Sequence, residues 1–474
     1  MYIKCVRLQE IKCFQDITLY FQSANQTGDP QSNWNVILGN NGDGKTTLLQ
    51  AIAGSLMDAT TAERMLKLQN WVRNGQQLAR MTATVIQQDG DKQNGHQPKE
   101  NKPDRTLQYL IANGNQEIRG HDEALPQFFA TASILEPMPD YRALFTHDFE
   151  SLFNDLDFLK RNAFRRQSKN GWISCGYGAF RRLSGFTNHS ALVDDQLQKR
   201  FITLFEEGAA LYDCEMWLKE LDRKAAKSPA QSKMRHTLCE VKEIILELLP
   251  DAPVDDIQIE DEVSFLWQGD QINLDQLSDG YRSMFALTVD LLRWLTILRP
   301  DNSCKLNELN GVVLIDEIDA HLHPKWQREA GFLLTKVFPH IQFIVATHSP
   351  FVAMAAGEGA LTLLERDGHV VSAKQDVPYV RGWAINQVLT QLFGMIHLRD
   401  PETTRKLERY ETLRFAHRAG KLNPSEMQEL AELEVYLNDR LTGEPESPKR
   451  RALDHDLAFF MNALNNKKNG TEDD

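Results

Sequence analysis

Apolar and polar positions alternate differently in successive parts of the chain, and the changes of period predict its elements. In the N-terminal part, residues 1–22 and 34–38 read as strands, and residues 44–57 have the spacing of a helix. Residues 81–87 and 106–112 predict the two strands of a hairpin. The segment between these two strands is polar and rich in Gly, Pro, Asn and Lys, which predicts a solvated loop.

The middle of the chain changes to a helical period. From about residue 126 to Pro250, apolar residues recur at spacings of three and four, which predicts helices that end at this proline. Beyond it we expect a helix at 281–298 and short strands at 257–267, 311–316 and 341–347.

Helices are predicted from residue 382 to the C-terminal end. Asn423 is a predicted N-cap, with proline next and Glu426 three residues later. Helices at 403–419 and 424–441, joined at Gly420, would face each other with apolar stripes. The stripes consist of Leu407, Tyr410 and Leu413 in one helix and Leu430, Leu433 and Leu437 in the other.

The C-terminal region, 383–474, is therefore predicted to be an assembly or partner-docking region. Its last segment, "SPKRRALDHDLAFFMNAL" (447–464), offers an apolar face for a partner. This face comprises Leu453, Leu457, Phe460 and Met461. Packing of the region on the rest of its own chain is the alternative.

Composition excludes several classes of protein. The chain has 474 residues and a formal net charge of −13, which argues against broad nucleic-acid binding through net charge. The six cysteines are scattered without a C-x-x-C pair, as expected for a reducing cytoplasm. No signal-peptide core or membrane-spanning run is present, so we expect a soluble cytoplasmic protein without a membrane partner.

One local basic stretch departs from the acidic average. Residues 160–171, "KRNAFRRQSKNG", could meet DNA phosphates, whereas a solvated helix face is the more common explanation. Its charged and aromatic members are Lys160, Arg161, Phe164, Arg165, Arg166 and Lys169.

A glycine-rich turn between the strand at 34–38 and the helix at 44–57 matches G-x-x-x-x-G-K-T from Gly39 to Thr46. Such a loop turns backbone N–H groups and a helix N-terminus toward phosphates, so we expect it to bind ATP with Mg²⁺. Lys45 would reach the β- and γ-phosphates, and the Thr46 hydroxyl would bind the metal ion. The expected nucleotide-binding residues are Asn40, Asn41, Gly42, Asp43, Gly44, Lys45, Thr46 and Thr47.

Two adjacent carboxylates follow the apolar strand "GVVLI". Asp316 would lie at the carboxyl end of this strand, where it can hold Mg²⁺, and Glu317 could polarise an attacking water. His321 and His323 with Asp319 are a poor metal cage, because Pro324 follows directly. We expect a structural or interface role for these histidines.

Two further segments carry residues that could contact the nucleotide. Ser278 and Gly280 of "LSDG" precede a long amphipathic helix, and a helix N-terminus is an anion site. Two chains packed head to tail could place Ser278 of one chain on the ATP that is held by Lys45 of the other. His348 in "IVATHSP" follows another strand and could touch the γ-phosphate.

The phosphate loop, LSDG, Asp-Glu and His occur in an order that resembles the ABC-type ATPases, and within them the soluble RecF/SMC/OLD-like branch. The resemblance covers residues 1–375 and implies an α/β P-loop ATPase head with a helical insertion and a helical C-terminal extension. Lys12 matches a basic residue near the nucleotide in that branch. The segment "GYGAFRRL" (176–183) resembles the strand that carries the Q-loop, but it lacks the expected glutamine, which puts the water- and metal-sensing role of that loop in doubt.

The resemblance also implies a division of the chain. Residues 1–125 and 311–382 would form the ATPase lobe, and 126–310 the helical insertion with the signature-bearing lobe. The tail, which lacks the acidic pattern of a nuclease domain, resembles that of the ATPase subunits of Septu anti-phage systems, which work with a separate HNH nuclease. Catalysis would then rest on Glu317 and His348 in a head-to-tail dimer or larger oligomer.

Two other functions are compatible with the motifs. A DNA repair or maintenance ATPase of the RecF/SMC kind is the first, and the acidic net charge and the lack of a long coiled coil argue against it. The ATP-binding subunit of a membrane importer is the second, and its usual L-S-G-G-Q wording is absent.

Overall fold

The computed structural model describes most of the chain in separate ranges. These are residues 2–57, 62, 65–66, 71–76, 78–86, 105–112, 173–179, 181, 196–209, 211, 214–249, 254–260, 262–299, 304–395 and 397–441. The chain divides into two compact units, Met1–Trp383 and Ala384–Asp474. In the described ranges, no helix has the length and apolar character needed to cross a bilayer.

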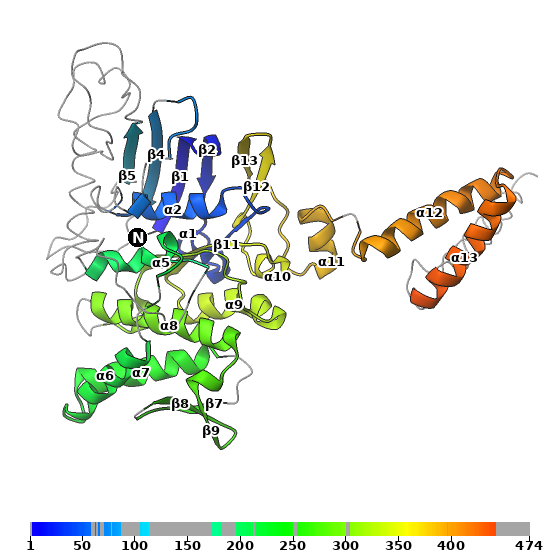
Figure 1. Cartoon of the computed structure of the whole chain (residues 1–474). Coiled ribbons are helices and arrows are strands. Elements are labelled where there is room, and N and C mark those ends of the chain that lie inside the picture. The colour runs from blue at the N-terminus through cyan, green and yellow to red at the C-terminus, as the bar shows by residue number, and fades with distance from the viewer. Residues whose placement is uncertain are drawn as a thin grey trace, which may run out of the picture. The chain divides into compact units, whose positions relative to one another are not determined.

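A six-stranded sheet forms the centre of the first unit (Figure 1). Its order is β13-β12-β3-β11-β10-β6, and every neighbouring pair is parallel except β12 with β13. The strands are β3 (Trp34–Leu38), β6 (Ile173–Tyr177), β10 (Gly311–Ile315), β11 (Ile341–Thr347), β12 (Leu361–Asp367) and β13 (Val370–Lys374). The residues of β3, β6, β10 and β11 are buried throughout, as expected for strands covered on both faces.

An antiparallel sheet, β2-β1-β4-β5, lies beside the central one. Its strands are β1 (Tyr2–Ile11), β2 (Phe14–Tyr20), β4 (Leu78–Ile86) and β5 (Arg105–Ala112). Helix α2 (Lys45–Ser55) contacts strands of both sheets. One apolar core joins these elements, with Leu8, Leu48 and Ile344 among its fully buried members. The apolar core shared by the two sheets therefore fixes the position of the start of α2.

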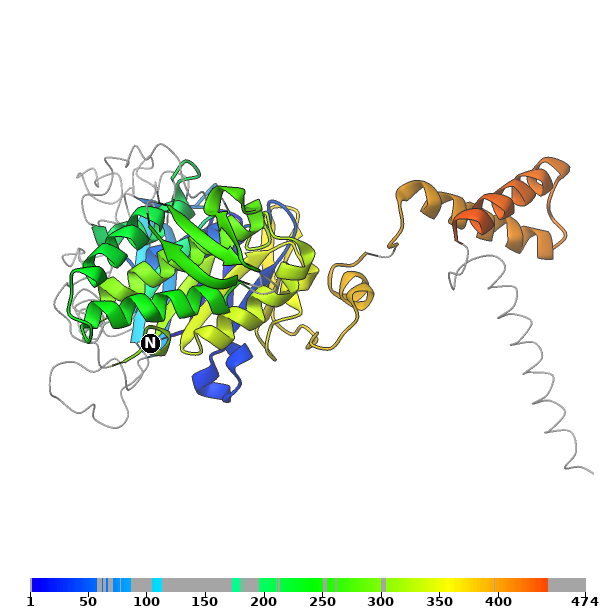
Figure 2. The ribbon, with the colours of Figure 1, turned by 90° about the horizontal axis from the view of Figure 1, so that it is seen from below.

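The second lobe of this unit is mostly helical. It contains η5 (Gln196–Phe201), α5 (Ile202–Phe205), α6 (Cys214–Ala226), α7 (Lys233–Glu247) and the long α8 (Asp279–Leu298). A small antiparallel sheet of β7 (Val254–Ile259), β8 (Val263–Trp267) and β9 (Asp270–Asn273) contacts α6 and α7. Figure 2 shows this sheet beside the two green helices.

The described ranges of the first unit contain further elements. They are α1 (Ala24–Thr27), η1 (Pro30–Asn33), η6 (Leu274–Gln276), η7 (Leu306–Glu308), α9 (Pro324–Val337) and α10 (Pro350–Ala353). The two sheets with the strand–loop–helix of β3 and α2 confirm the α/β P-loop ATPase head.

The second unit contains a helical hairpin of α12 (Pro401–Arg418) and α13 (Pro424–Arg440), preceded by α11 (Ile385–Gln387) and the π-helix η8 (Val388–Leu392). The side chain of Asn423 caps α13, as predicted. The Glu426 carboxylate in turn accepts a hydrogen bond from the Asn423 amide. Gly420 has a φ of +67° after α12, where only glycine turns freely. Leu407, Tyr410 and Leu437 share one buried cluster, so the predicted stripes do meet.

Several expectations need correction or completion. The Q-loop strand expected at 176–183 is β6, which ends at Tyr177, because backbone pairing with β10 stops there. This strand belongs to the central sheet, although its residues fall in the range expected to form the insertion. Strands β12 and β13 were not predicted. The basic stretch 160–171 and the terminal segment 447–464 lie outside the described residues.

Candidate nucleotide-binding site

Five parallel strands bring the candidate residues to one edge of the central sheet. Gly39 comes directly after β3, Asp316 after β10 and His348 after β11. The carboxyl ends of parallel strands lie at the same edge of a sheet, which is where α/β proteins bind ligands. Sequence positions some 300 residues apart therefore meet here, as the motifs predicted.

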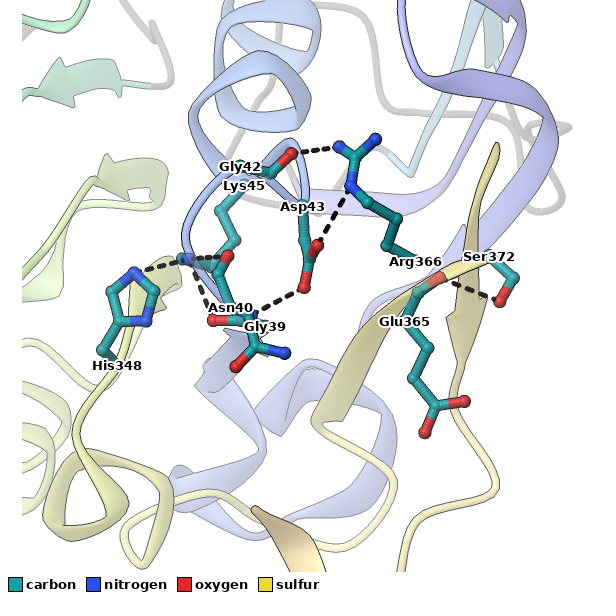
Figure 3. A network of polar contacts seen from close by, with 9 residues as sticks. All are labelled: Gly39, Asn40, Gly42, Asp43, Lys45, His348, Glu365, Arg366 and Ser372. Carbon is teal, nitrogen blue, oxygen red and sulfur yellow. Dashed lines mark hydrogen bonds and ion pairs between the residues drawn. The ribbon is translucent and has the colours of Figure 1, made fainter. Parts of the chain in front are cut away.

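Lys45 is buried near the end of the phosphate loop. Its ammonium group points back to the carbonyl oxygens at the start of the loop (Figure 3). Its Nζ donates to the carbonyl oxygens of Gly39 at 3.0 Å and Asn40 at 3.1 Å, and it lies 2.7 Å from Nε2 of His348. Burial lowers the pKa of Lys45, and the charge of Asp316 opposes that change. The ammonium group is thus held in the loop by exchangeable acceptors that a phosphate oxygen can replace.

Thr46 and Asp316 form the second contact between the loop and β10. The Thr46 hydroxyl donates to Asp316 Oδ2 at 2.5 Å. Within the described part of the chain, the buried Asp316 Oδ1 has no hydrogen-bond partner. Burial raises the pKa of Asp316, and the bond from Thr46 counteracts this. A hydroxyl and a carboxylate with a spare oxygen are the donor set that Mg²⁺ prefers, so these residues fit the expected ion.

His348 faces Lys45 with a neutral ring. A lysine has only donors, so Nε2 of His348 must accept in this contact. Burial lowers the pKa of His348, and the charge of Lys45 lowers it further. The imidazole is therefore a neutral neighbour of the position where a γ-phosphate would displace the lysine contact.

The middle of the phosphate loop is bound by Arg366, a residue of β12. Arg366 donates to the carbonyl of Gly42, and its Nε lies 3.4 Å from Asp43 Oδ1. The other Asp43 oxygen accepts from the Asn40 amide at 2.7 Å, which closes the turn (Figure 3). Asn41 is exposed at the tip of this turn, and Thr47 is half-buried in the first turn of α2. Sequence reasoning missed Arg366 because it missed the strand that carries it.

Glu317 lies next to the predicted metal ligand, in an unusual backbone conformation. Its φ is +44°, a region that costs a non-glycine residue energy and is found at functional sites. The following residue is fixed by a bond from the Ile318 amide to the Ala346 carbonyl in β11. Arg181, which sequence reasoning also missed, donates to the Glu317 carbonyl at 3.2 Å.

Thr347 and Ser349, the residues on either side of His348, are linked by hydrogen bonds to the loop that follows Glu317. The Thr347 hydroxyl donates to Asp319 Oδ1, and the Ser349 hydroxyl donates to Gln327 at 2.6 Å. Gln327 in turn donates to the Leu322 carbonyl at 2.8 Å. The segment of His348 and the segment of Glu317 are therefore joined on both sides of the histidine.

Of the neighbouring histidines, His323 makes a structural contact. His323 caps α9 by accepting from the Lys325 amide at 3.3 Å, and His321 occupies a turn with a φ of +67°. No group of three or more His, Cys, Asp or Glu side chains in the described ranges is arranged to hold a metal ion.

The LSDG segment lies at the start of α8, beside the loop that follows Glu317. Ser278 is the exposed N-cap residue, but its side chain makes no capping bond to the described helix. Its hydroxyl is therefore not used by its own helix. A Cβ on Gly280 would lie 2.8 Å from the His321 carbonyl oxygen, so only glycine allows α8 to approach this closely.

Lys12 has a different position from the other candidates. Its ammonium lies 4.3 Å from the centre of the Trp71 ring, a cation–π contact, and burial lowers its pKa. The next residue, Cys13, lies against Gly44 of the phosphate loop. A role of Lys12 in nucleotide binding stays a prediction.

Comparison with protein families gives two matches. Residues 136–355 match a family described as an AAA domain, putative AbiEii toxin, Type IV TA system. Residues 5–206 match a family described as an AAA domain. Together the two ranges include the phosphate loop, Asp316 and His348.

Individual proteins are also similar. The Septu protein PtuA of Bacillus mycoides (strain KBAB4) is 26% identical over 444 residues, which are 93% of this chain and 50% of that protein. The Retron Ec83 probable ATPase of Escherichia coli is 41% identical over 145 residues, 30% of this chain and 26% of that protein. The similarity to a Septu protein, expected from the layout and the C-terminal tail, is confirmed. The chain spans about half the length of the first relative and about a quarter of the second.

Among solved structures, the crystal structure of the SmcHead bound to the C-winged helix domain of ScpA is similar. The match has a TM-score of 0.44 and 13% sequence identity, and it covers 79% of this chain and 97% of that one.

Proposed function

We propose that this chain is the ATP-binding and ATP-hydrolysing subunit of a cytoplasmic anti-phage defence complex. One observation carries the proposal: Lys45, Thr46, Asp316 and His348 meet within hydrogen-bond distance at one edge of the central sheet. A phosphate-binding function accounts for the presence of a buried lysine, a threonine and a half-satisfied carboxylate at this place.

Each residue has a task in this reaction. Lys45 and the loop amides bind the β- and γ-phosphates, because they supply fixed positive charge. Thr46 and Asp316 would hold Mg²⁺, which neutralises the charge that develops on the phosphate oxygens. Glu317 orients and polarises the attacking water. His348 contacts the γ-phosphate through Nε2, the nitrogen that now faces Lys45, and this nitrogen must carry a proton in that state because a phosphate oxygen only accepts.

A second copy of the chain completes the site in this proposal. The hydroxyl of Ser278 and the N-terminus of α8 are exposed and can meet a nucleotide held by a partner. Head-to-tail pairing gives each ATP one phosphate loop and one LSDG segment. ATP is then the link that holds the two heads together.

The biological role rests on the relatives. The similarity to a Septu PtuA protein extends over 93% of the chain, and a retron ATPase is 41% identical over a shorter range. We therefore assign the chain to phage defence, where its ATP-dependent state would control a separate HNH nuclease. The C-terminal helical unit, roughly 383–474, is the proposed site of assembly or partner docking.

Purified protein with ATP and Mg²⁺ tests the biochemical part. Lys45→Ala should abolish nucleotide binding, because it removes the central phosphate contact. Lys374→Ala, at an exposed lysine of β13, should bind and hydrolyse like the wild type. Glu317→Gln should bind ATP without turnover and accumulate as a dimer in light scattering. Equal binding by the Lys45 and Lys374 variants would refute the assignment.

A plaque assay tests the biological part. Where an HNH reading frame lies beside that of this chain, cells that carry both should resist phages, and Lys45→Ala should remove the resistance at unchanged protein level. Resistance that persists in this variant would show that ATP binding has no part in defence. A permease reading frame in place of the nuclease would favour transport.

A further inference from the structure

Arg181 lies just beyond β6 and makes an unusual set of contacts for a buried arginine. Its guanidinium donates five bonds of 3.0–3.4 Å to main-chain carbonyl oxygens. The acceptors belong to Gly178, Asp316, Glu317, Ile318 and Ala320. A sixth contact joins its Nε to the Ser283 hydroxyl in α8 at 3.2 Å. One side chain therefore holds the whole turn that carries Glu317.

The chemistry of arginine suits this position. The guanidinium is planar and has five donor hydrogens, so it can serve several carbonyls at once, whereas a lysine ammonium has three. Burial lowers the pKa of Arg181 to about 10, and the nearby Asp319 carboxylate opposes this change. The side chain is therefore charged at neutral pH, and charge-assisted bonds are the stronger kind.

The turn requires such support. Glu317 has a φ of +44°, and such strained residues persist only where their surroundings hold them. Arg181 donates to the carbonyl oxygen of Glu317 and to those of its two chain neighbours, Asp316 and Ile318. Without these bonds, the strain would be relieved by rotation of the backbone, which would move the Glu317 carboxylate.

The same arginine connects the turn to α8. Ser283 lies about one helical turn after the LSDG segment, and a Cβ on Gly280 would lie 2.8 Å from the His321 carbonyl oxygen, so α8 packs closely on the far end of the turn. The LSDG segment and Glu317 are thus joined at two points in one chain. In a head-to-tail dimer these two elements serve different ATP molecules, so Arg181 lies between the two sites.

We propose that Arg181 is a positioning residue that holds Glu317 for ATP hydrolysis and ties its turn to α8. The proposal rests on the proposed ATPase function. Arg181 lies in the segment 176–183, where the resemblance to the Q-loop strand implied a glutamine.

The test compares Arg181→Ala with Arg299→Ala. Arg299 is an equally buried arginine at the other end of α8, where it binds Glu240 at 2.8 Å and Thr237 at 2.6 Å. We expect Arg181→Ala to bind ATP with an unchanged Kd and to lose about 100-fold or more in kcat, since small misplacement of a reacting group has effects of that size. Arg299→Ala should keep its kcat per folded molecule.

Chemical rescue separates positioning from general destabilisation. Added guanidinium should restore part of the kcat of Arg181→Ala, whereas methylammonium should not. Arg181→Lys should remain slow, because an ammonium cannot serve the same carbonyls. Full activity in Arg181→Lys, or an unchanged kcat in Arg181→Ala, would overturn the proposal.

Hydrogen exchange gives a readout that does not depend on hydrolysis. The amides of residues 318–322 should exchange faster in Arg181→Ala than in Arg299→Ala. If the wild type itself hydrolyses no ATP, the proposed function fails and this comparison still decides whether Arg181 holds the turn. If Arg181→Ala does not fold, Ser283→Ala replaces it, and equal kcat and exchange in Ser283→Ala and wild type would refute the tie to α8.

Discussion

Alanine at Gly44 should disable the phosphate loop, whereas alanine at Gly42, two residues earlier, should be tolerated. Both glycines have left-handed backbones of nearly the same φ, +87° and +86°. Their surroundings differ. A Cβ on Gly42 would meet nothing within 4 Å, but a Cβ on Gly44 would lie 2.7 Å from Cys13 Sγ and 2.8 Å from the Phe14 ring. The pair therefore separates backbone strain from crowding.

The two contributions can be sized. An L-residue in the left-handed region costs about 1–2 kcal/mol, and both variants bear this cost. Forcing a methyl group into a filled core adds about 1–3 kcal/mol, and only Gly44→Ala bears it. The Phe14 ring is fully buried, so it cannot turn aside into solvent. We expect a loss in unfolding free energy of about 1–2 kcal/mol for Gly42→Ala and about 2–5 kcal/mol for Gly44→Ala.

The crowding also has a functional consequence. Gly44 immediately precedes Lys45 and Thr46, so relief of the clash must move the start of α2 away from β1 and β2. A shift that removes 1.4 kcal/mol of phosphate contact weakens the Kd for ATP about tenfold. Urea unfolding and ATP titration measure the two effects separately. Addition of Cys13→Ala to Gly44→Ala should recover part of the loss. The reasoning is refuted if Gly42→Ala is as damaging as Gly44→Ala, or if removal of the Cys13 sulfur recovers nothing.

Two further predictions concern His348 and the second unit. The pKa of His348 is lower in the folded chain than in the unfolded one, so the unfolded state binds more protons. Nucleotide-free protein should therefore lose stability as pH falls below about 6.5. His348→Gln should flatten this loss in thermal unfolding between pH 8 and pH 5.5, and an equal slope in both proteins would contradict the assignment. Leu437→Ala, at a fully buried position of α13, should destabilise the hairpin by about 2–5 kcal/mol in limited proteolysis, whereas Val435→Ala, at a position 72% exposed, should not. ATP binding should survive Leu437→Ala, and its loss would contradict independent folding of the two units.

The parts that sequence predicted are those in which local chemistry dictates position. A buried strand followed by glycines and Lys45 leaves few alternatives to a phosphate loop, and an apolar strand that ends in Asp316 points to the same edge of the sheet. The capping box at Asn423 is equally local, and it was predicted to the residue. In each case the signal lies within about eight residues of the chain.

The parts that sequence missed depend on contacts between distant segments. Arg366 looks like an exposed strand residue until β12 pairs with β3 beside the phosphate loop. Arg181 belongs to a pair of arginines that a pattern cannot tell from a solvated turn, yet the fold buries it among five carbonyl oxygens. Strand β6 was misplaced for the same reason, since its limits are set by pairing with β10 and not by its own period.

These distant contacts explain how the site can be both strained and precise in position. Thr347 and Ser349, on either side of His348, reach the loop of Glu317 through Asp319 and Gln327. Arg181 holds the same loop from β6, so three strands and α8 converge on a single turn. If His348 contacts the γ-phosphate as proposed, these hydrogen bonds offer a direct route from it to Glu317 and α8. In the proposed head-to-tail dimer that route would end at the partner's nucleotide, and Arg181 would then act in place of the missing Q-loop glutamine with a side chain of a different chemical kind.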